Sequence, residues 1–146
     1  MPWAKNGEQW HSSVKGFPPG QGCRWEQGLL KQLMTIIGKI DPDAEINYNL
    51  RDAIHIKPSY CKAFCLRIKT KEADYLQVIC YCNKGQFNIT RIEGLAPTID
   101  YITSKPKGDE AHLFYSKIKD LDALKLAAFL KELRAGLLQM HGTGTK

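Results

Sequence analysis

The chain has 146 residues, of which 43% are apolar and 25% charged, and its 21 Lys and Arg against 15 Asp and Glu give a formal net charge of +6. This length and composition are typical of one globular domain and exclude a disordered tail, a collagen-like rod and a bare coiled coil. No apolar run approaches the roughly 18 residues of a membrane span, and the first residues lack the apolar stretch of a secretory signal. We therefore expect a cytoplasmic protein that does not associate with membranes.

Residues 1–22 are predicted to form an irregular N-terminal arm, because glycine and proline recur through them and stop both helices and strands. Three large aromatic residues in this arm indicate that it is held against the domain or against a partner. A helix is predicted from about Arg24 to Ile40, where apolar residues recur at spacings of three and four. Asp41-Pro42 ends it, since proline disfavours a helical residue before it.

After this helix the apolar period changes from about 3.6 residues to 2, which is typical of strands with one buried face. Five or six short strands are predicted, in the segments 46–50, 54–57, 64–69, 76–81, 87–90 and 114–118. Two of the links between them are short and either polar or glycine-containing, which favours antiparallel hairpins. Residues 94–111, with two prolines and two glycines, form the longest predicted loop.

The last helix is predicted from about Leu121 to Met140, with Asp120 as its N-cap. Its first half is apolar on more than one face, so one side packs on the sheet and the other needs the first helix, the arm or a second subunit. Residues 141–146 are expected to form a flexible tail. The order of elements predicts a two-layer α+β fold in which residues 23–140 form one domain, with an N-terminal and a C-terminal helix on one face of an antiparallel sheet.

Five cysteines at irregular spacing indicate reduced thiols rather than a disulfide framework. Cys61, Cys65, Cys80 and Cys82 have the ligand number of a zinc site, but strand alternation puts the two pairs on opposite faces of the sheet. We therefore expect neither a metal nor another cofactor, and we interpret Cys80 and Cys82 as small core residues.

Catalytic patterns are weak in this sequence. Four histidines accompany the five cysteines, but no local signature marks one thiol as a nucleophile. The acidic residues fall at predicted turns, strand edges and helix starts, and not within strands that converge on a cleft. A P-loop and a GxGxxG motif are both absent. The sequence predicts a protein that is not an enzyme, and a cysteine-dependent enzyme stays open as an alternative.

The outer face of the predicted sheet collects positive charge. Five positive residues and no acid lie from position 57 to position 71, and four of them alternate with the apolar residues of the same strand. Tyrosines and amides of the following strands share this face, which also includes Tyr115 and Lys117 of the last predicted strand. Cations neutralise phosphates and exposed rings stack on bases, so the pattern is typical of a sheet that binds RNA. A solvated face with lysines at its edges is the alternative.

We predict a small, basic, non-catalytic domain that binds RNA or single-stranded DNA on this face. The expected site residues are Arg67, Lys69, Lys71, Lys117 and Lys119 for phosphates, Tyr75 and Tyr81 for stacking, and Gln77 and Asn88 for base edges. The alternative is a protein-interaction module or accessory subunit, which would bind a protein partner or a second copy of the chain through the apolar C-terminal helix and the aromatic arm.

Overall fold

The computed structural model describes residues 11, 25–26, 28–50, 52–59, 65–70 and 74–141. The predicted arm apart from His11, and the tail beyond residue 141, lie outside this description. The helical elements are α3 (Leu29–Ile40), α4 (Ile89–Ile92), the 3-10 turn η1 (Ile118–Asp120) and α5 (Ala123–His141). The strands are β1 (Glu45–Asn47), β2 (Ala53–Lys57), β3 (Leu66–Lys69), β4 (Leu76–Cys82), β5 (Thr98–Ile102) and β6 (Asp109–Tyr115).

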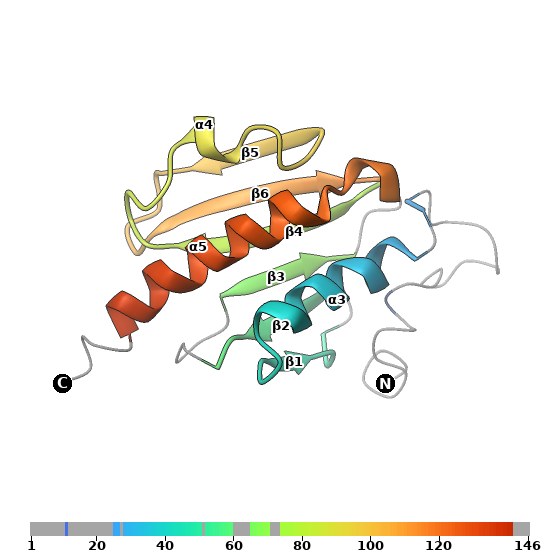
Figure 1. Cartoon of the computed structure of the whole chain (residues 1–146), viewed down its shortest axis with the longest axis horizontal. Coiled ribbons are helices and arrows are strands. Elements are labelled where there is room, and N and C mark those ends of the chain that lie inside the picture. Colours follow the sequence, from blue (N-terminus) through green and yellow to red (C-terminus); the bar gives the residue numbers. More distant parts are fainter. Residues whose placement is uncertain are drawn as a thin grey trace.

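These six strands form one antiparallel sheet in the order β1-β2-β3-β4-β6-β5. Helices α3 and α5 lie next to each other across one face of the sheet, which we call the inner face (Figure 1). The reverse is the outer face. The predicted α+β fold, with an antiparallel sheet and both helices on one face, is confirmed. Among the described residues, no helix has the length and apolar character needed to cross a membrane.

Helix α3 begins later than its apolar pattern predicts. Gly28 has a φ of 92°, a left-handed conformation that residues other than glycine rarely adopt, and the helix starts at the next residue. Trp25, which the periodicity assigned to the helix, is buried ahead of it. At the other end the helix stops at Ile40, before Asp41-Pro42, as predicted.

Two strand predictions are wrong. The segment predicted as a strand around Phe87 and Ile89 is the turn that leads into α4, because the Asn88 side chain accepts a hydrogen bond from Arg91 N (3.0 Å) and starts a helical turn. Residues 94–111 were predicted as a loop but contain β5, the edge strand that pairs with β6.

The facing of β6 is also opposite to the prediction. Its inner residues are Asp109, Ala111, Leu113 and Tyr115, which are buried, whereas Phe114 faces outward with His112. Tyr115 is 0% exposed, and its hydroxyl donates to Leu95 O at 2.7 Å. A buried tyrosine with a satisfied hydroxyl belongs to the core, so Tyr115 is not part of the outer face.

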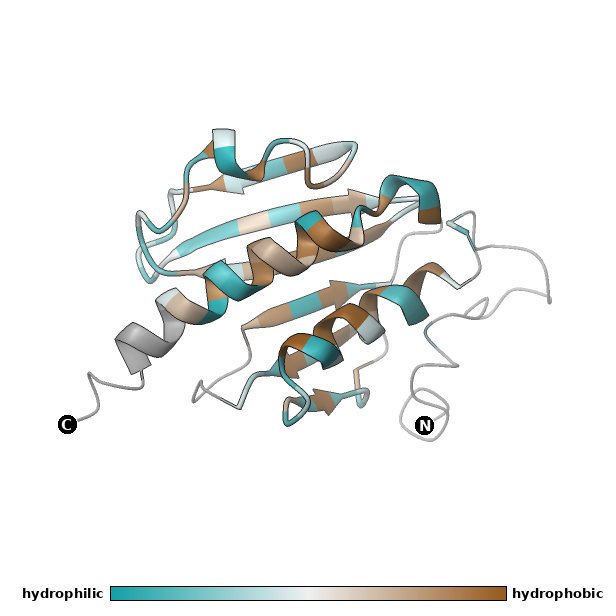
Figure 2. Cartoon of the chain, in the orientation of Figure 1, coloured by the Kyte–Doolittle hydropathy of each residue, from teal (hydrophilic) through white to brown (hydrophobic). Residues whose placement is uncertain are grey.

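The core lies between the sheet and the two helices. Figure 2 shows apolar residues on α3, on α5 and on the strands β3 and β4 that they cover. Asp122, not Asp120, accepts from the first turn of α5, through Lys125 N (3.1 Å). Helix α5 also contacts α3. Leu124 of this helix is 85% exposed.

Candidate nucleic-acid interface

The outer face is ordered in rows that cross the strands. The register places one residue from each of five neighbouring strands in a single row: Ala53, Lys69, Gln77, Phe114 and Thr98. None of these side chains is in the buried class. Because adjacent strands lie about 4.8 Å apart, a cation, an amide and an aromatic ring are neighbours along this row, which we call the platform row.

The next row runs through the middle of the sheet and consists of Asn47, His55, Arg67, Ile79, His112 and Asp100. Arg67 Nε donates to His55 Nε2 at 3.1 Å. Burial and the neighbouring Arg67 charge lower the pKa of His55, so this imidazole is neutral and accepts the bond. This hydrogen bond holds the Arg67 side chain of β3 towards the neighbouring strand β2.

A second set of hydrogen bonds links the rows. The Gln77 amide donates to His112 Nδ1 (2.9 Å), and His112 Nε2 donates to Glu110 (2.9 Å). Both ring nitrogens of His112 are therefore engaged with neighbouring side chains. This arrangement fixes the orientation of Gln77 and gives His112 no free nitrogen for proton transfer.

The platform row borders a shallow pocket where β4 begins and β6 ends. The Tyr75 and Phe114 rings meet edge to face, with centroids 5.2 Å apart and an interplanar angle of 78°. The pocket has a volume of about 340 Å³. Its lining residues come from both strands, the start of β5 and η1: Tyr75, Pro97, Thr98, Phe114, Ser116 and Asp120.

Charge is divided across the outer face. The cations Lys57, Arg67 and Lys69 lie on β2 and β3, whereas the acids lie on the strands to either side: Glu110 and Asp100 on β6 and β5, and Glu45 opposite Lys57 on β1. The sequence pattern predicted the cationic half but missed the acids on β6 and β5, because it placed the opposite face of β6 outward and did not predict β5.

The structure places five of the predicted site residues together on the outer face: Arg67, Lys69, Tyr75, Gln77 and Tyr81. Burial raises the pKa of Tyr81, while the Arg67 charge opposes that shift. Lys71 lies outside the described residues. The sequence analysis missed three residues of the outer face: Phe114, His112 and Thr98. Phe114 and His112 flank Leu113, so assigning Leu113 to the core would have placed both of them on the outer face by strand alternation.

Three predicted site residues are not on this face. Asn88 is the N-cap of α4 and is used there by Arg91 N. Lys117 and Lys119 do not belong to a strand, because β6 ends at Tyr115; they belong to the exposed turn around η1. That turn supplies Asp120 to the pocket, so the two lysines are close in sequence to the pocket rim.

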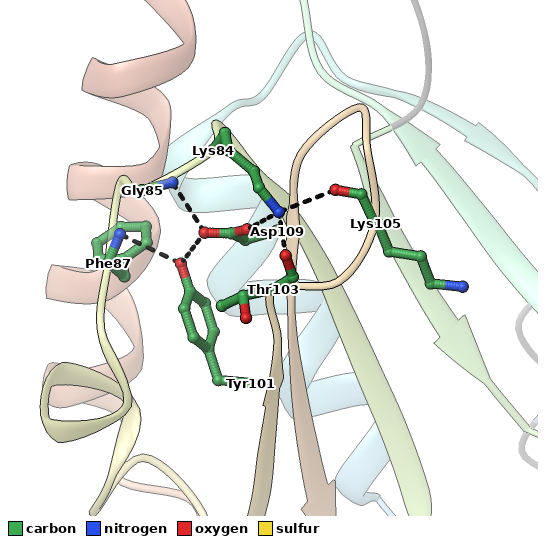
Figure 3. A network of polar contacts seen from close by, with 7 residues as sticks. All are labelled: Lys84, Gly85, Phe87, Tyr101, Thr103, Lys105 and Asp109. Carbon is green, nitrogen blue, oxygen red and sulfur yellow. Dashed lines mark hydrogen bonds and ion pairs between the residues drawn. The ribbon is translucent and has the colours of Figure 1, made fainter.

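A second polar cluster lies at the opposite end of β6, on the inner face (Figure 3). Asp109 Oδ2 accepts from Gly85 N (2.8 Å) and from the Tyr101 hydroxyl (3.0 Å), and Oδ1 pairs with Lys84 Nζ at 3.3 Å. Lys84 also donates to the carbonyls of Thr103 and Lys105. We call this set the Asp109 cluster.

The Asp109 cluster joins the turn after β4 to the β5–β6 hairpin. Burial alone would raise the pKa of Asp109, but the bonds from Gly85 and Tyr101 and the Lys84 charge outweigh burial and lower it. Burial and the bond to Asp109 raise the pKa of Tyr101. The carboxylate is thus ionised, the phenol is protonated and each is bound to the other, which is the state of a structural network and not of an acid or base awaiting a substrate.

The described cysteines do not form a reactive centre. Cys65, Cys80 and Cys82 are buried. Burial raises the pKa of the Cys82 thiol to about 12 and also raises that of Cys80, so both are neutral thiols. Among the residues that the structure describes, no group of three or more His, Cys, Asp or Glu is arranged to hold a metal ion; Cys61 lies outside them.

Comparisons of the chain with protein-family models, with curated proteins and with solved structures each found no significant match.

Proposed function

We propose that the protein binds single-stranded nucleic acid across the outer face of its sheet. The observation that carries this proposal is the platform row, in which Lys69, Gln77 and Phe114 are cross-strand neighbours and end at an open pocket. No described helix or strand covers this face, because α3 and α5 both lie on the inner one (Figure 1).

Phosphate contacts come from the cationic half of the face. Lys57 and Lys69 are partly exposed on β2 and β3, and the net charge of +6 attracts a polyanion to the whole molecule. Lys117 and Lys119 add exposed positive charge near the pocket rim. Glu110 and Asp100 repel phosphates from the other half, so the nucleic-acid backbone runs over β2 and β3 while the bases lie towards β4 and β6.

Base contacts come from the aromatic pair. Tyr75 and Phe114 are both partly exposed and line the pocket. Stacking of a base on an aromatic side chain contributes about 1–3 kcal/mol and tolerates any sequence. Only unpaired bases expose their faces in this way, which favours a single strand over a duplex.

The test is fluorescence anisotropy with labelled ten-nucleotide RNA and DNA strands over a salt series. Lys69→Ala removes one phosphate contact, so it weakens binding and reduces the dependence of log affinity on log salt by about 0.7. Tyr75→Ala weakens binding roughly fivefold or more, through lost stacking. Lys131→Ala is the matched control, because it removes the same charge from the exposed surface of α5.

Binding that does not respond to salt would contradict the proposal. So would equal losses for Lys69→Ala and Lys131→Ala, because the net charge and not the outer face would then govern affinity. A complementary duplex of the same length should bind more weakly than either single strand.

A further inference from the structure

The pocket beside the aromatic pair has one carboxylate among its lining side chains, that of Asp120. Asp120 Oδ2 accepts a hydrogen bond from Lys117 N at 3.2 Å. No hydrogen bond from any described residue reaches Oδ1. Each carboxylate oxygen has two lone pairs, so Asp120 retains acceptor capacity on both oxygens. It lies on η1, where it lines the pocket together with Tyr75 and Phe114.

The remaining polar groups of the pocket are weaker or already engaged. The Ser116 hydroxyl donates to Asp74 O (2.8 Å). Thr98 is exposed at the start of β5 and can donate or accept. The pocket therefore combines two aromatic rings, a carboxylate that only accepts, and the hydroxyls of Tyr75 and Thr98, which can donate or accept. A planar ligand that suits it has two adjacent N–H donors on one edge and a ring face for stacking.

Among the four bases of RNA, only guanine has that edge. Its ring N–H and its exocyclic amine stand side by side and match the two oxygens of a carboxylate. Adenine and cytosine place an acceptor nitrogen beside their amine, and uracil places its single N–H between two carbonyls. A carboxylate facing any of these three meets at least one acceptor, which is repulsive.

We infer that this pocket binds a guanine base of the single strand, stacked against the Tyr75–Phe114 pair with its donor edge on Asp120. This inference rests on the proposed function and adds to it a base preference at one position. The volume of about 340 Å³ falls within the range of small-ligand pockets. The Asp120 carboxylate in the pocket does not prevent binding of a negatively charged nucleic acid, because the uncharged base and not the phosphate enters the pocket.

The experiment uses four labelled ten-nucleotide RNAs that consist of uridine except at one central position, which is G, A, C or U. The full chain should bind the G strand at least about fivefold more tightly than the other three, since a bidentate base contact discriminates by that much or more. Asp120→Asn should abolish this preference. Its amide oxygen still accepts from Lys117 N, so η1 is retained.

Asp100→Asn is the matched control. It makes the same charge change on the outer face, at an exposed position of β5 outside the pocket. It should raise the affinity for all four strands to a similar extent and preserve the preference for G.

Equal binding of the four RNAs by the wild-type protein would overturn the guanine inference. If Lys69→Ala and Tyr75→Ala still weakened binding, the proposed function would stand without it. Retention of the G preference in Asp120→Asn would also overturn the inference. Failure of every strand to bind would overturn both.

Discussion

The two ends of β6 differ in how their polar groups are used. At its start, Asp109 is 2% exposed, accepts hydrogen bonds from Gly85 and Tyr101 and forms an ion pair with Lys84. After its end, Asp120 is partly exposed and accepts a single bond from Lys117 N, beside a pocket of about 340 Å³. One aspartate is enclosed by partners from the chain, whereas the other keeps acceptor capacity beside solvent.

This difference separates a structural site from a binding site. A buried network whose groups all bind one another stabilises one arrangement and leaves nothing for a ligand. Aromatic rings and a partly used carboxylate around a concavity are the usual composition of a ligand site. The comparison of the ends therefore predicts that substitutions at the start of β6 lower stability and that substitutions after its end lower affinity.

The largest effect on stability is expected from Asp109→Ala. Removal of this carboxylate leaves the Tyr101 hydroxyl, Gly85 N and the Lys84 ammonium without their shared acceptor. We expect the free energy of unfolding to fall by about 2–4 kcal/mol, measured by urea denaturation. Asp120→Asn should change it by less than about 1 kcal/mol. Similar losses for both variants would contradict the comparison.

A smaller effect is expected from removing one hydroxyl at each end. The Tyr101 hydroxyl donates to Asp109 at 3.0 Å and accepts from Phe87 N at 3.2 Å. Tyr101→Phe should therefore lower the free energy of unfolding by about 1–2 kcal/mol, since it leaves a buried carboxylate and a backbone N–H with fewer partners.

Tyr75→Phe is the matched control for this measurement. No hydrogen bond from the described residues engages the Tyr75 hydroxyl, while its ring packs on Phe114. We expect a change within about 0.5 kcal/mol and no loss of oligonucleotide binding, because the ring remains. A Tyr75→Phe protein as unstable as Tyr101→Phe would show that the pocket end is also a structural network.

Much of the fold could be predicted from local periodicity. Strands β2 and β3 show clean alternation, with Ile54 and Ile68 among the inner residues, and β4 departs from it only at Ile79, which is buried at an outer position. The edge strand β5 was missed because Pro97 and Pro106 bracket it and favoured a loop. Four-residue helices such as α4 are too short to show a helical period, so only the Asn88 cap could have identified that one.

The candidate site could be predicted only in its β3–β4 half. Lys69, Tyr75 and Gln77 share a face that follows from alternation within one hairpin. The other half depends on the pairing of β6 with β4 and on a buried polar residue, Asp109, at an inner position. The sequence analysis placed this strand at residues 114–118 and took the apolar Phe114 as an inner residue, which gave β6 the opposite facing. Asp120 joins the pocket only through tertiary packing of η1.

The pH dependence of the free energy of unfolding provides the last test of the Asp109 cluster. Despite its burial, the pKa of Asp109 is lowered by hydrogen bonds from Gly85 and Tyr101 and by the Lys84 charge. At pH values between this lowered pKa and the ordinary aspartate pKa of the unfolded chain, Asp109 binds more protons in the unfolded chain than in the folded one. Acid therefore favours unfolding. The stabilisation is fully present above the ordinary aspartate pKa of about 3.9 and is lost as pH falls through the lowered value.

Urea denaturation of the wild type and of Asp109→Asn from pH 7 to pH 3 tests this. The asparagine cannot ionise, so the difference in unfolding free energy between the two proteins should narrow as the pH approaches 3. Two curves that stay parallel over this range would mean that the Asp109 carboxylate gains nothing from its partners. The carboxylate at the start of β6 would then be stabilised by its partners no more than the carboxylate after the end of β6. The distinction between a structural site at one end and a binding site at the other would fail.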